Sequence, residues 1–382
     1  MNIVARLILL TPLILFAPTG FARSEDGLTA ESRDVPAWAT SPDRKTLLAA
    51  LKPPKRPGRP VIAVIGLNEG TETTDYLVPF GVLKRADVAE VLGLSTRSGP
   101  ITLMPALNII PDATVAEFEH KYPEGADYVI VPAMFPANDP ETTGWISAQA
   151  AKGAIIVGIC TGARVLGQAG LLVERRATSH WYDLATVREE NPTMIYVPNR
   201  RYVVDRGVAS STGVSASIPV SLTLIEAIAG YQQAAKVAVE LGVDNWDDQH
   251  QSDEFTARSD FLITAALNTL AFWRYETLRI DIEPGVDEIA LGLTADAWSR
   301  TYQSKVLIAA ADAEVVTTRG GIRVVPDKKQ EYEASDASLP ALAASFPARA
   351  LDTSLQQIGE RYGRPTRKFV ATQLEYSAGL PR

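Results

Sequence analysis

The single cysteine of this 382-residue chain stands where a reactive thiol is expected. Cys160 follows a run of β-forming residues, and Thr161-Gly162-Ala163 opens a helix directly after it. Such a strand-to-helix turn presents one side chain at the carboxyl edge of a parallel sheet, next to the free N–H groups of the helix. These N–H groups lower the pKa of a cysteine and can hold an oxyanion. We therefore expect a nucleophile that ionises more easily than free cysteine; the alternative is a small buried apolar residue.

Strands and helices alternate on both sides of this cysteine. Continuous apolar, β-branched runs predict buried parallel strands, and a turn pattern separates each of them from a helix. The expected strands are 61–67, 88–95, 101–104, 107–110, 128–132 and 154–159, and the expected helices are 74–86, 114–121, 143–152 and one from the cysteine turn to Gly170. This order predicts a doubly wound α/β sheet, with its ligand site outside the carboxyl ends of the strands.

The first 22 residues have the pattern of a secretory signal peptide. A short basic start containing Arg6 precedes the apolar stretch 7–16, and Gly20-Phe21-Ala22 is a small-x-small cleavage site. The apolar stretch is shorter than the ~20 residues that a spanning helix needs. We expect a protein that is exported to the periplasm or secreted, without a stable membrane span after cleavage. The alternative is a leader that is kept as an anchor.

Composition excludes several other classes of function. The formal net charge is −8, which argues against binding to nucleic acid. A single cysteine allows no intrachain disulfide bond. The acidic stretch 244–254 surrounds His250, but its spacing matches no defined metal-ligand set, so a solvated loop is favoured. No metal or other cofactor is expected.

The chain divides into five segments by composition and pattern. These are a signal peptide at 1–22, a Pro- and Lys-rich linker at 23–58 with one short helix around 45–51, an α/β domain at 59–230, a helical bridge at 231–274 and a second α/β unit at 275–382. The last segment repeats motifs of the first half, because 280–291 and 315–327 echo the first apolar strand and the stretch 94–112. We interpret it as a truncated, cysteine-free copy; coincidence between two amphipathic α/β segments is the alternative.

Several motifs resemble the ThiJ/PfpI superfamily. They are Thr74-Asp75-Tyr76-Leu77-Val78-Pro79-Phe80-Gly81, Asp127-Tyr128-Val129-Ile130-Val131-Pro132, Gly158-Ile159-Cys160-Thr161-Gly162-Ala163, Ala177-Thr178-Ser179-His180-Trp181 and Ser211-Thr212-Gly213-Val214. The resemblance implies a flavodoxin-like sheet related to class I glutamine amidotransferases. It is nearest to isocyanide hydratases and to the domain in front of some AraC-type regulators.

The resemblance also assigns roles to residues of this chain. Cys160 would be the elbow nucleophile, Asp75 the acid that reaches its sulfur, and His180 a nearby imidazole. The amides of Thr161, Gly162 and Ala133 would form the anion hole, and Met134, Glu69, Trp181 and Thr212 would line the pocket. Where the family has a Gly-Gly pair this chain has Ala133-Met134, so Met134 is expected to crowd the pocket.

Two of these roles have structural alternatives. Asp75 could cap the helix that begins near Tyr76, since Asp is a good N-cap, and Glu69 and Glu72 are alternative acids in the same loop. His180 could be a half-buried polar residue at a strand end rather than a general base.

Two classes of function fit these residues. The first is a cysteine-dependent hydratase or hydrolase for a small electrophile, with Asp75 as the proton donor. The second is a non-catalytic protein that binds a small ligand or senses oxidants through the same cysteine. In both cases the partner is a small molecule, and two copies of the chain could form a homodimer.

Overall fold

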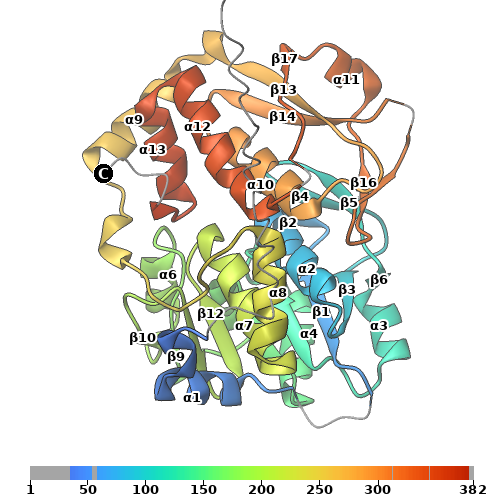
Figure 1. The fold of residues 1–382 in the computed structure, drawn as a ribbon, viewed down its shortest axis with the longest axis vertical. Coiled ribbons are helices and arrows are strands. Elements are labelled where there is room, and N and C mark those ends of the chain that lie inside the picture. Colours follow the sequence, from blue (N-terminus) through green and yellow to red (C-terminus); the bar gives the residue numbers. More distant parts are fainter. Residues whose placement is uncertain (1–34, 54–57, 312, 344, 378–382) are drawn as a thin grey trace, which may run out of the picture. The chain divides into compact units, whose positions relative to one another are not determined.

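A mostly parallel sheet of seven strands organises the N-terminal part of the chain (Figure 1). The computed structural model describes residues 35–53, 58–311, 313–343 and 345–377, so the expected leader lies outside the described residues. The strand order is β11-β12-β8-β7-β1-β3-β6, and only β11 runs antiparallel to its neighbour. The strands are β1 (Val61–Gly66), β3 (Glu90–Ser95), β6 (Ala113–Thr114), β7 (Tyr128–Val131), β8 (Ile155–Gly158), β11 (Tyr202–Asp205) and β12 (Val208–Ser211).

Helices cover both faces of this sheet and enclose two apolar cores. One core lies under α2 (Thr73–Ala86), α7 (Ser217–Ala229) and α8 (Tyr231–Leu241). The other lies under α3 (Val115–Lys121), α4 (Pro140–Ala151), α5 (Gly162–Gln168) and α6 (Leu184–Glu190). A short pair, β9 (Arg176–Ala177) and β10 (Ile195–Tyr196), lies outside the main sheet. The predicted doubly wound, flavodoxin-like architecture is therefore confirmed.

The helix expected at 114–121 begins one residue later. Thr114 caps α3 and forms a capping box with Glu117. Asp112 accepts a 2.8 Å hydrogen bond from the N–H of Gly93. The carboxylate therefore ties the end of β5 (Asn108–Ile110) to β3.

The C-terminal region is a second α/β unit, as expected. Its parallel sheet has the order β14-β13-β17, formed by β13 (Glu276–Asp281), β14 (Ser304–Ala309) and β17 (Ala337–Ser338). The order matches β3-β1-β7 of the first unit. The remaining elements are α10 (Glu288–Ser299), β15 (Val316–Thr317), β16 (Arg323–Val325), α11 (Lys329–Glu333), α12 (Ala350–Tyr362) and α13 (Arg364–Gln373).

Aspartate side chains repeat the same backbone contacts in both units. Asp327 accepts a 2.7 Å hydrogen bond from the N–H of Ile308 in β14, as Asp112 does from Gly93 in β3. Asp336 binds the N–H of Thr277 at 2.7 Å, as Asp127 binds that of Val61 at 2.8 Å. Coincidence does not produce matching contacts at matching strand positions, so the segment is an internal repeat of 61–131.

The two units share one further sheet and are not separate globules. The strand order β15-β16-β5-β4-β2 joins strands of both, where β2 is Glu69–Glu72 and β4 is Ile101–Met104. No helix among the described residues is long and apolar enough to cross a membrane.

The bridge between the units is helical, and most of its acidic loop is exposed, as expected. Helix α9 (Ser259–Leu270) follows α8, and the described residues also form the 3-10 turns η2 (Ala37–Thr40), η3 (Val214–Ala216), η4 (Ser252–Glu254), η5 (Phe272–Arg274) and η6 (Pro347–Arg349). Two residues of the loop are nevertheless packed inside: Trp246 is buried, and the side chain of His250 is 6% exposed and stacks on Phe255. The acidic spacing did not reveal this packing, because it depends on contacts with segments far away in the sequence.

The described part of the expected linker belongs to the folded unit. Helix α1 (Pro42–Ala50) packs on α7, and the buried guanidinium group of Arg44 binds Glu226 at 2.5 Å and the hydroxyl of Tyr202 at 2.6 Å. The indole N–H of Trp246 donates to the same Glu226 carboxylate at 2.9 Å. Residues 35–53 are therefore part of the folded unit, and Ala39, Arg44 and Leu51 are buried in it.

Replacing Arg44 by alanine should destabilise the protein by about 3–5 kcal/mol, because Glu226 would remain buried without its cation. Urea unfolding followed by tryptophan fluorescence measures the change. Lys45→Ala, at the neighbouring exposed position, should change the free energy of unfolding by less than about 0.5 kcal/mol. Equal effects of the two changes would contradict this account of the segment.

Candidate functional site

Cys160 lies at a strained turn between β8 and α5. Its φ is +57°, in the left-handed region that residues other than glycine seldom adopt. Its N–H donates a 3.0 Å hydrogen bond to the hydroxyl of Ser211 at the end of β12, which holds the turn to the sheet. A Cβ on Gly162 would lie 2.1 Å from the carbonyl oxygen of Val131, so glycine is required for this close approach. The turn is the elbow that the sequence predicts.

The thiol is buried, and burial raises its pKa. The carboxyl groups of Asp75 and Glu72 raise the pKa further, whereas a hydrogen bond from the Thr161 N–H lowers it. The expectation of an easily ionised thiol is therefore wrong for this closed site. One helix N–H contributes as expected, but loss of solvent and nearby negative charge outweigh it.

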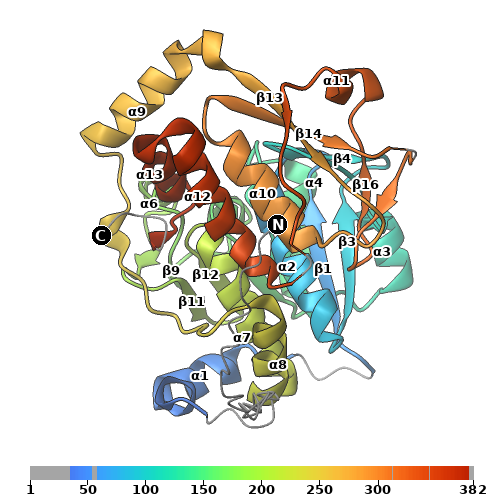
Figure 2. The same ribbon diagram turned by 45° about the horizontal axis from the view of Figure 1, so that its top comes forward.

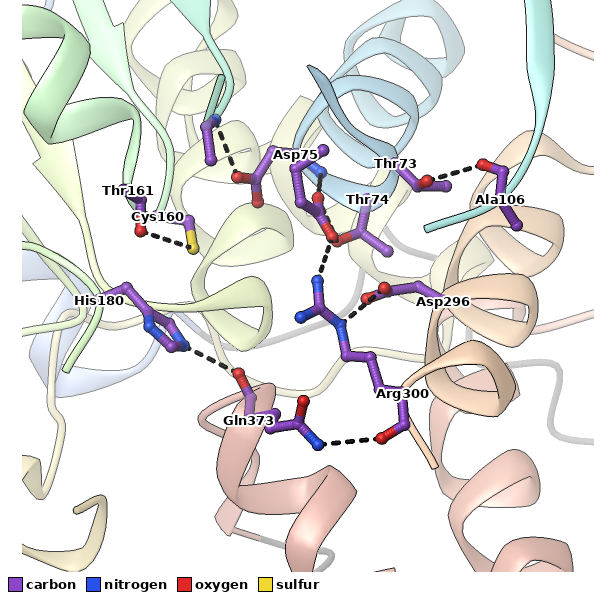
Figure 3. Close-up of polar contacts among 12 residues, drawn as sticks. Thr73, Thr74, Asp75, Ala106, Cys160, Thr161, His180, Asp296, Arg300 and Gln373 are labelled. Atoms are coloured by element: carbon purple, nitrogen blue, oxygen red, sulfur yellow. Dashed lines mark hydrogen bonds and ion pairs between the residues drawn. The ribbon is translucent and has the colours of Figure 1, made fainter. Parts of the chain in front are cut away.

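Asp75 is fully buried on α2 and faces Cys160 (Figure 3). Its Oδ2 accepts a 3.1 Å hydrogen bond from the N–H of Ala133, and its Oδ1 is buried without a hydrogen-bond partner among the described residues. Burial and the neighbouring Glu72 carboxylate raise its pKa well above the usual range. An ionised Asp75 in turn raises the pKa of Cys160, so negative charge on the carboxyl group disfavours the thiolate.

The alternative role of Asp75 as a helix cap is wrong. Glu72 caps α2. Its carboxylate accepts a 2.6 Å hydrogen bond from the N–H of Asp75 and a 2.9 Å hydrogen bond from the hydroxyl of Thr74. Asp75 lies one turn further on, where its carboxyl group is free to face the thiol. Glu72 is thus the helix cap, and Asp75 is the acid beside the sulfur.

The second α/β unit contributes an arginine to this cluster. Arg300, at the end of α10, donates from Nη2 to Glu72 at 2.7 Å and from Nε to Asp296 at 2.7 Å (Figure 3). Burial raises the pKa of Asp296 to about 8, and the Glu72 charge adds to this while Arg300 opposes it. The neighbouring carboxylates raise the pKa of Arg300. At neutral pH the cluster therefore holds one cation beside Glu72 and keeps its proton on Asp296.

His180 is held by the backbone on both ring nitrogens. Nδ1 accepts a 3.2 Å hydrogen bond from the N–H of Tyr182. The proton is therefore on Nε2, which donates a 2.8 Å hydrogen bond to the carbonyl oxygen of Gln373. Burial lowers its pKa, so the ring is neutral at pH 7. In this arrangement neither nitrogen is free to accept a proton from Cys160.

The C-terminal segment after α13 closes the site. Glu375 has a φ of +50°, its side chain is 2% exposed and its carboxylate accepts a hydrogen bond from the N–H of Gly213. His250 approaches the same carboxylate, with Nε2 3.6 Å from Oε1. The charge of Glu375 contributes to raising the pKa of Cys160. The C-terminal segment therefore packs near the thiol and helps to raise the thiol pKa.

The expected anion hole is smaller than the family motif implies. The N–H of Gly162 donates to the carbonyl oxygen of Ile159 at 2.6 Å, and that of Ala133 donates to Asp75. The Thr161 N–H alone of these three is directed at the sulfur. Two of the three expected amide donors are thus committed to holding the turn and the acid.

The expected pocket residues do not gather around the thiol. Met134 is buried in the apolar core under α3 to α6, whereas Cys160 belongs to the opposite core, so Met134 does not crowd the site. Glu69 is exposed and lines a separate surface pocket with Arg97 and Phe135. Trp181 donates its indole N–H to Thr372 at 2.8 Å. Thr212 is buried near the cysteine strand, and its hydroxyl has no hydrogen-bond partner among the described residues.

Sequence reasoning missed Arg300, Asp296 and Glu375. Each lies far from Cys160 along the chain, and none belongs to a motif of the first half. The internal repeat could have indicated Arg300, because it stands at the position in α10 that Arg85 holds in α2. No local signal identifies Glu375.

Asp296→Asn should flatten the pH dependence of stability. Below about pH 4 both folded and unfolded states hold the proton, whereas between about pH 4 and 8 only the folded state does, so stability falls as pH rises through this window. Removing this group should reduce the slope by up to about 1.4 kcal/mol per pH unit. The measurement is urea unfolding at a series of pH values, with Asp253→Asn at an exposed position as the control. An unchanged slope would mean that Asp296 is already ionised in the folded protein.

Several known proteins are similar to this chain over its first half. Isonitrile hydratase from Pseudomonas putida is 37% identical over 106 residues, which cover 27% of this chain and 44% of that protein. The HTH-type transcriptional regulator CdhR from Pseudomonas aeruginosa is 29% identical over 184 residues, 47% of this chain and 51% of that protein. The chain thus spans about half the length of these relatives. Parkinson disease protein 7 homolog from Danio rerio is 25% identical over 185 residues, 95% of that protein.

Solved structures that match this chain cover a similar share of it. Drosophila melanogaster DJ-1beta is 21% identical with a TM-score of 0.44 and covers 49% of this chain and 100% of its own. A ThiJ/PfpI family protein from Pseudomonas syringae is 23% identical with a TM-score of 0.44 and covers 57% of this chain and 85% of its own. The family model for DJ-1/PfpI matches residues 61–227. The resemblance to the ThiJ/PfpI superfamily is confirmed, and residues 61–227 form a DJ-1/PfpI domain.

Proposed function

We propose that this domain is a cysteine-dependent hydratase or hydrolase for a small electrophile, with Cys160 as nucleophile and Asp75 as proton donor. The observation that carries the proposal is the pairing of two buried acids: the thiol at a strained elbow and the partner-free Oδ1 of Asp75 facing it. A buried carboxyl group with a raised pKa keeps its proton to higher pH than a free carboxyl group does and can deliver it to a substrate.

The geometry supports a two-step reaction at an electrophilic carbon. The thiol adds to the carbon of an isonitrile or nitrile: sulfur bonds to the carbon while Asp75 gives its proton to the substrate and takes up the thiol proton, so that a thioimidate forms. Water then adds to the thioimidate carbon, and Asp75 relays one proton of the water to the nitrogen. The carbon–sulfur bond breaks as the sulfur takes up the hydroxyl proton, which leaves an amide and Cys160 as thiol. The Thr161 N–H is placed to stabilise charge beside the sulfur during these steps.

Burial of the site favours a small, mostly uncharged substrate. Cys160 is 7% exposed, and Glu375 lies close enough for its charge to raise the thiol pKa. The similarity to isonitrile hydratase supports testing isonitriles first, followed by nitriles and aldehydes.

The alternative is an oxidant or ligand sensor that uses the same cysteine without turnover. The presence of a single cysteine favours this candidate, because a sulfenic acid at Cys160 has no second cysteine with which to form an intrachain disulfide. Export to an oxidising compartment, which we also propose from the leader pattern, would expose the thiol to such chemistry.

The test compares alkylation with turnover in matched variants. Asp75→Asn should make iodoacetamide labelling of Cys160 several-fold faster at the pH values where wild-type Asp75 is ionised, because that negative charge raises the thiol pKa and asparagine carries none. The same variant should lower turnover of an isonitrile by about 10²–10⁴-fold, because it removes the proton donor. Opposite changes in the two rates are specific to a proton-donating acid beside the thiol.

Two further variants complete the comparison. Cys160→Ser should abolish both labelling and turnover, and Glu69→Gln, in the same loop but exposed, should change neither. Turnover that persists in Cys160→Ser would refute the enzyme proposal. Normal labelling without turnover of any isonitrile, nitrile or aldehyde would favour the sensor.

A further inference from the structure

The internal repeat packs on the DJ-1/PfpI domain with local twofold symmetry. Helices α2 and α10, which are equivalent in the two units, pack against each other (Figure 2). A Cβ on Gly292 would lie 3.4 Å from the side chain of Leu77, which holds the matching position in α2. The equivalent strands β5 and β16 pair antiparallel, with Ile109 opposite its own counterpart Val324. Contacts between equivalent residues are the property of an isologous, twofold interface.

Two ion pairs repeat this symmetry. Arg85, in the last turn of α2, binds Asp287, the N-cap of α10. Arg300, the C-cap of α10, binds Glu72, the N-cap of α2, at 2.7 Å. The same separation along the chain relates Arg85 to Arg300 and Glu72 to Asp287. Each arginine therefore neutralises the cap of the opposite helix.

The two ends of the interface differ in chemistry. The repeat ends at β17, the counterpart of β7, so it has no equivalent of β8 or of its cysteine. Ala290 stands where α2 has Asp75. Arg85 thus meets an acidic cap without a thiol, whereas Arg300 lies within the site that contains Asp75 and Cys160 (Figure 3).

We propose that the C-terminal repeat is an in-chain partner, which occupies the α2 face in place of a second copy of the chain and supplies Arg300 as a positioning residue for the site. Arg300 holds Glu72 at the cap of α2 and balances its charge beside Asp75. The structural part of this proposal stands alone, and the role of Arg300 in the site rests on the proposed function. A homodimer, if it forms, uses another face.

Arg300→Gln and Arg85→Gln are matched variants for this proposal. Both remove an arginine from the same interface and from an equivalent ion pair. If the arginines had only a structural role, the two variants would change the measured value in the same way. The readout is the midpoint of the pH profile of Cys160 alkylation, which does not require turnover. The thiol faces Asp75 and Glu72 on the α2 side, and Glu375, His180 and Arg300 on the other.

Arg300→Gln should move the alkylation midpoint to higher pH, because the cation opposing these carboxylates is lost, and Arg85→Gln should leave it unchanged. Arg300→Lys, which keeps the charge, should restore most of the profile. Equal midpoints in all variants, or equal shifts in both glutamine variants, would overturn the role of Arg300. If Arg300→Gln does not fold, Arg300→Met and Arg85→Met, which also remove the charge, are compared instead, and a shift to higher pH in the former alone supports the proposal.

Sedimentation equilibrium of the full chain tests the in-chain partner. A mass that neither arginine variant changes supports an interface within one chain. A wild-type dimer that both variants dissociate would place these arginines between subunits and overturn the proposal. No turnover of any electrophile by the wild-type protein, together with a shifted midpoint in Arg300→Gln, would refute the enzyme proposal while leaving the in-chain partner intact.

Discussion

The ion pair between Glu72 and Arg300 joins the two units at the point where the chemistry is placed. Burying a carboxylate and a guanidinium group costs several kcal/mol each, and good geometry with additional hydrogen bonds is needed to offset that cost. Glu72 meets this condition, because it accepts from the Thr74 hydroxyl, the Asp75 N–H and Arg300. The same carboxylate caps α2, so the start of the helix, the position of Asp75 and the docking of α10 depend on one group.

The two groups of this ion pair act on the protonation of the site in opposite directions. Burial raises the pKa values of Asp75, Asp296 and Cys160, and the Glu72 carboxylate raises all three further, whereas Arg300 lowers those of Asp75 and Asp296. A cysteine at a helix N-terminus would ionise easily if it faced solvent, but here the thiol is buried. The chemistry therefore depends on moving a proton within a closed cluster rather than on a freely formed thiolate.

Local patterns in the sequence predict the scaffold well and the electrostatics poorly. The apolar β-branched runs before Leu67, Pro132 and Cys160 identify the central strands, because burial on both faces leaves a signal within a few residues. The elbow is equally local, since Gly162 is required by contact with the adjacent strand. The alternative of Asp75 as the cap of α2 was wrong, because Glu72 takes that position and both residue types suit it. Arg300 and Glu375 could not be placed, because their effect on Cys160 comes from contacts between segments far apart in the chain.

The asymmetry of the repeat explains why a second unit without a cysteine strand is sufficient to form the interface. An isologous interface between two full domains presents two sites, each completed by the opposite copy. In this chain the second unit keeps the elements that make the interface: α10, β16 and the arginine that follows α10. It lacks the strand that would carry a second cysteine. With one site to complete, the remaining constraint on the repeat is to hold Arg300 against Glu72. The backbone contacts of Asp327 and Asp336, which repeat those of the first unit, keep β13 and β14 in position for α10.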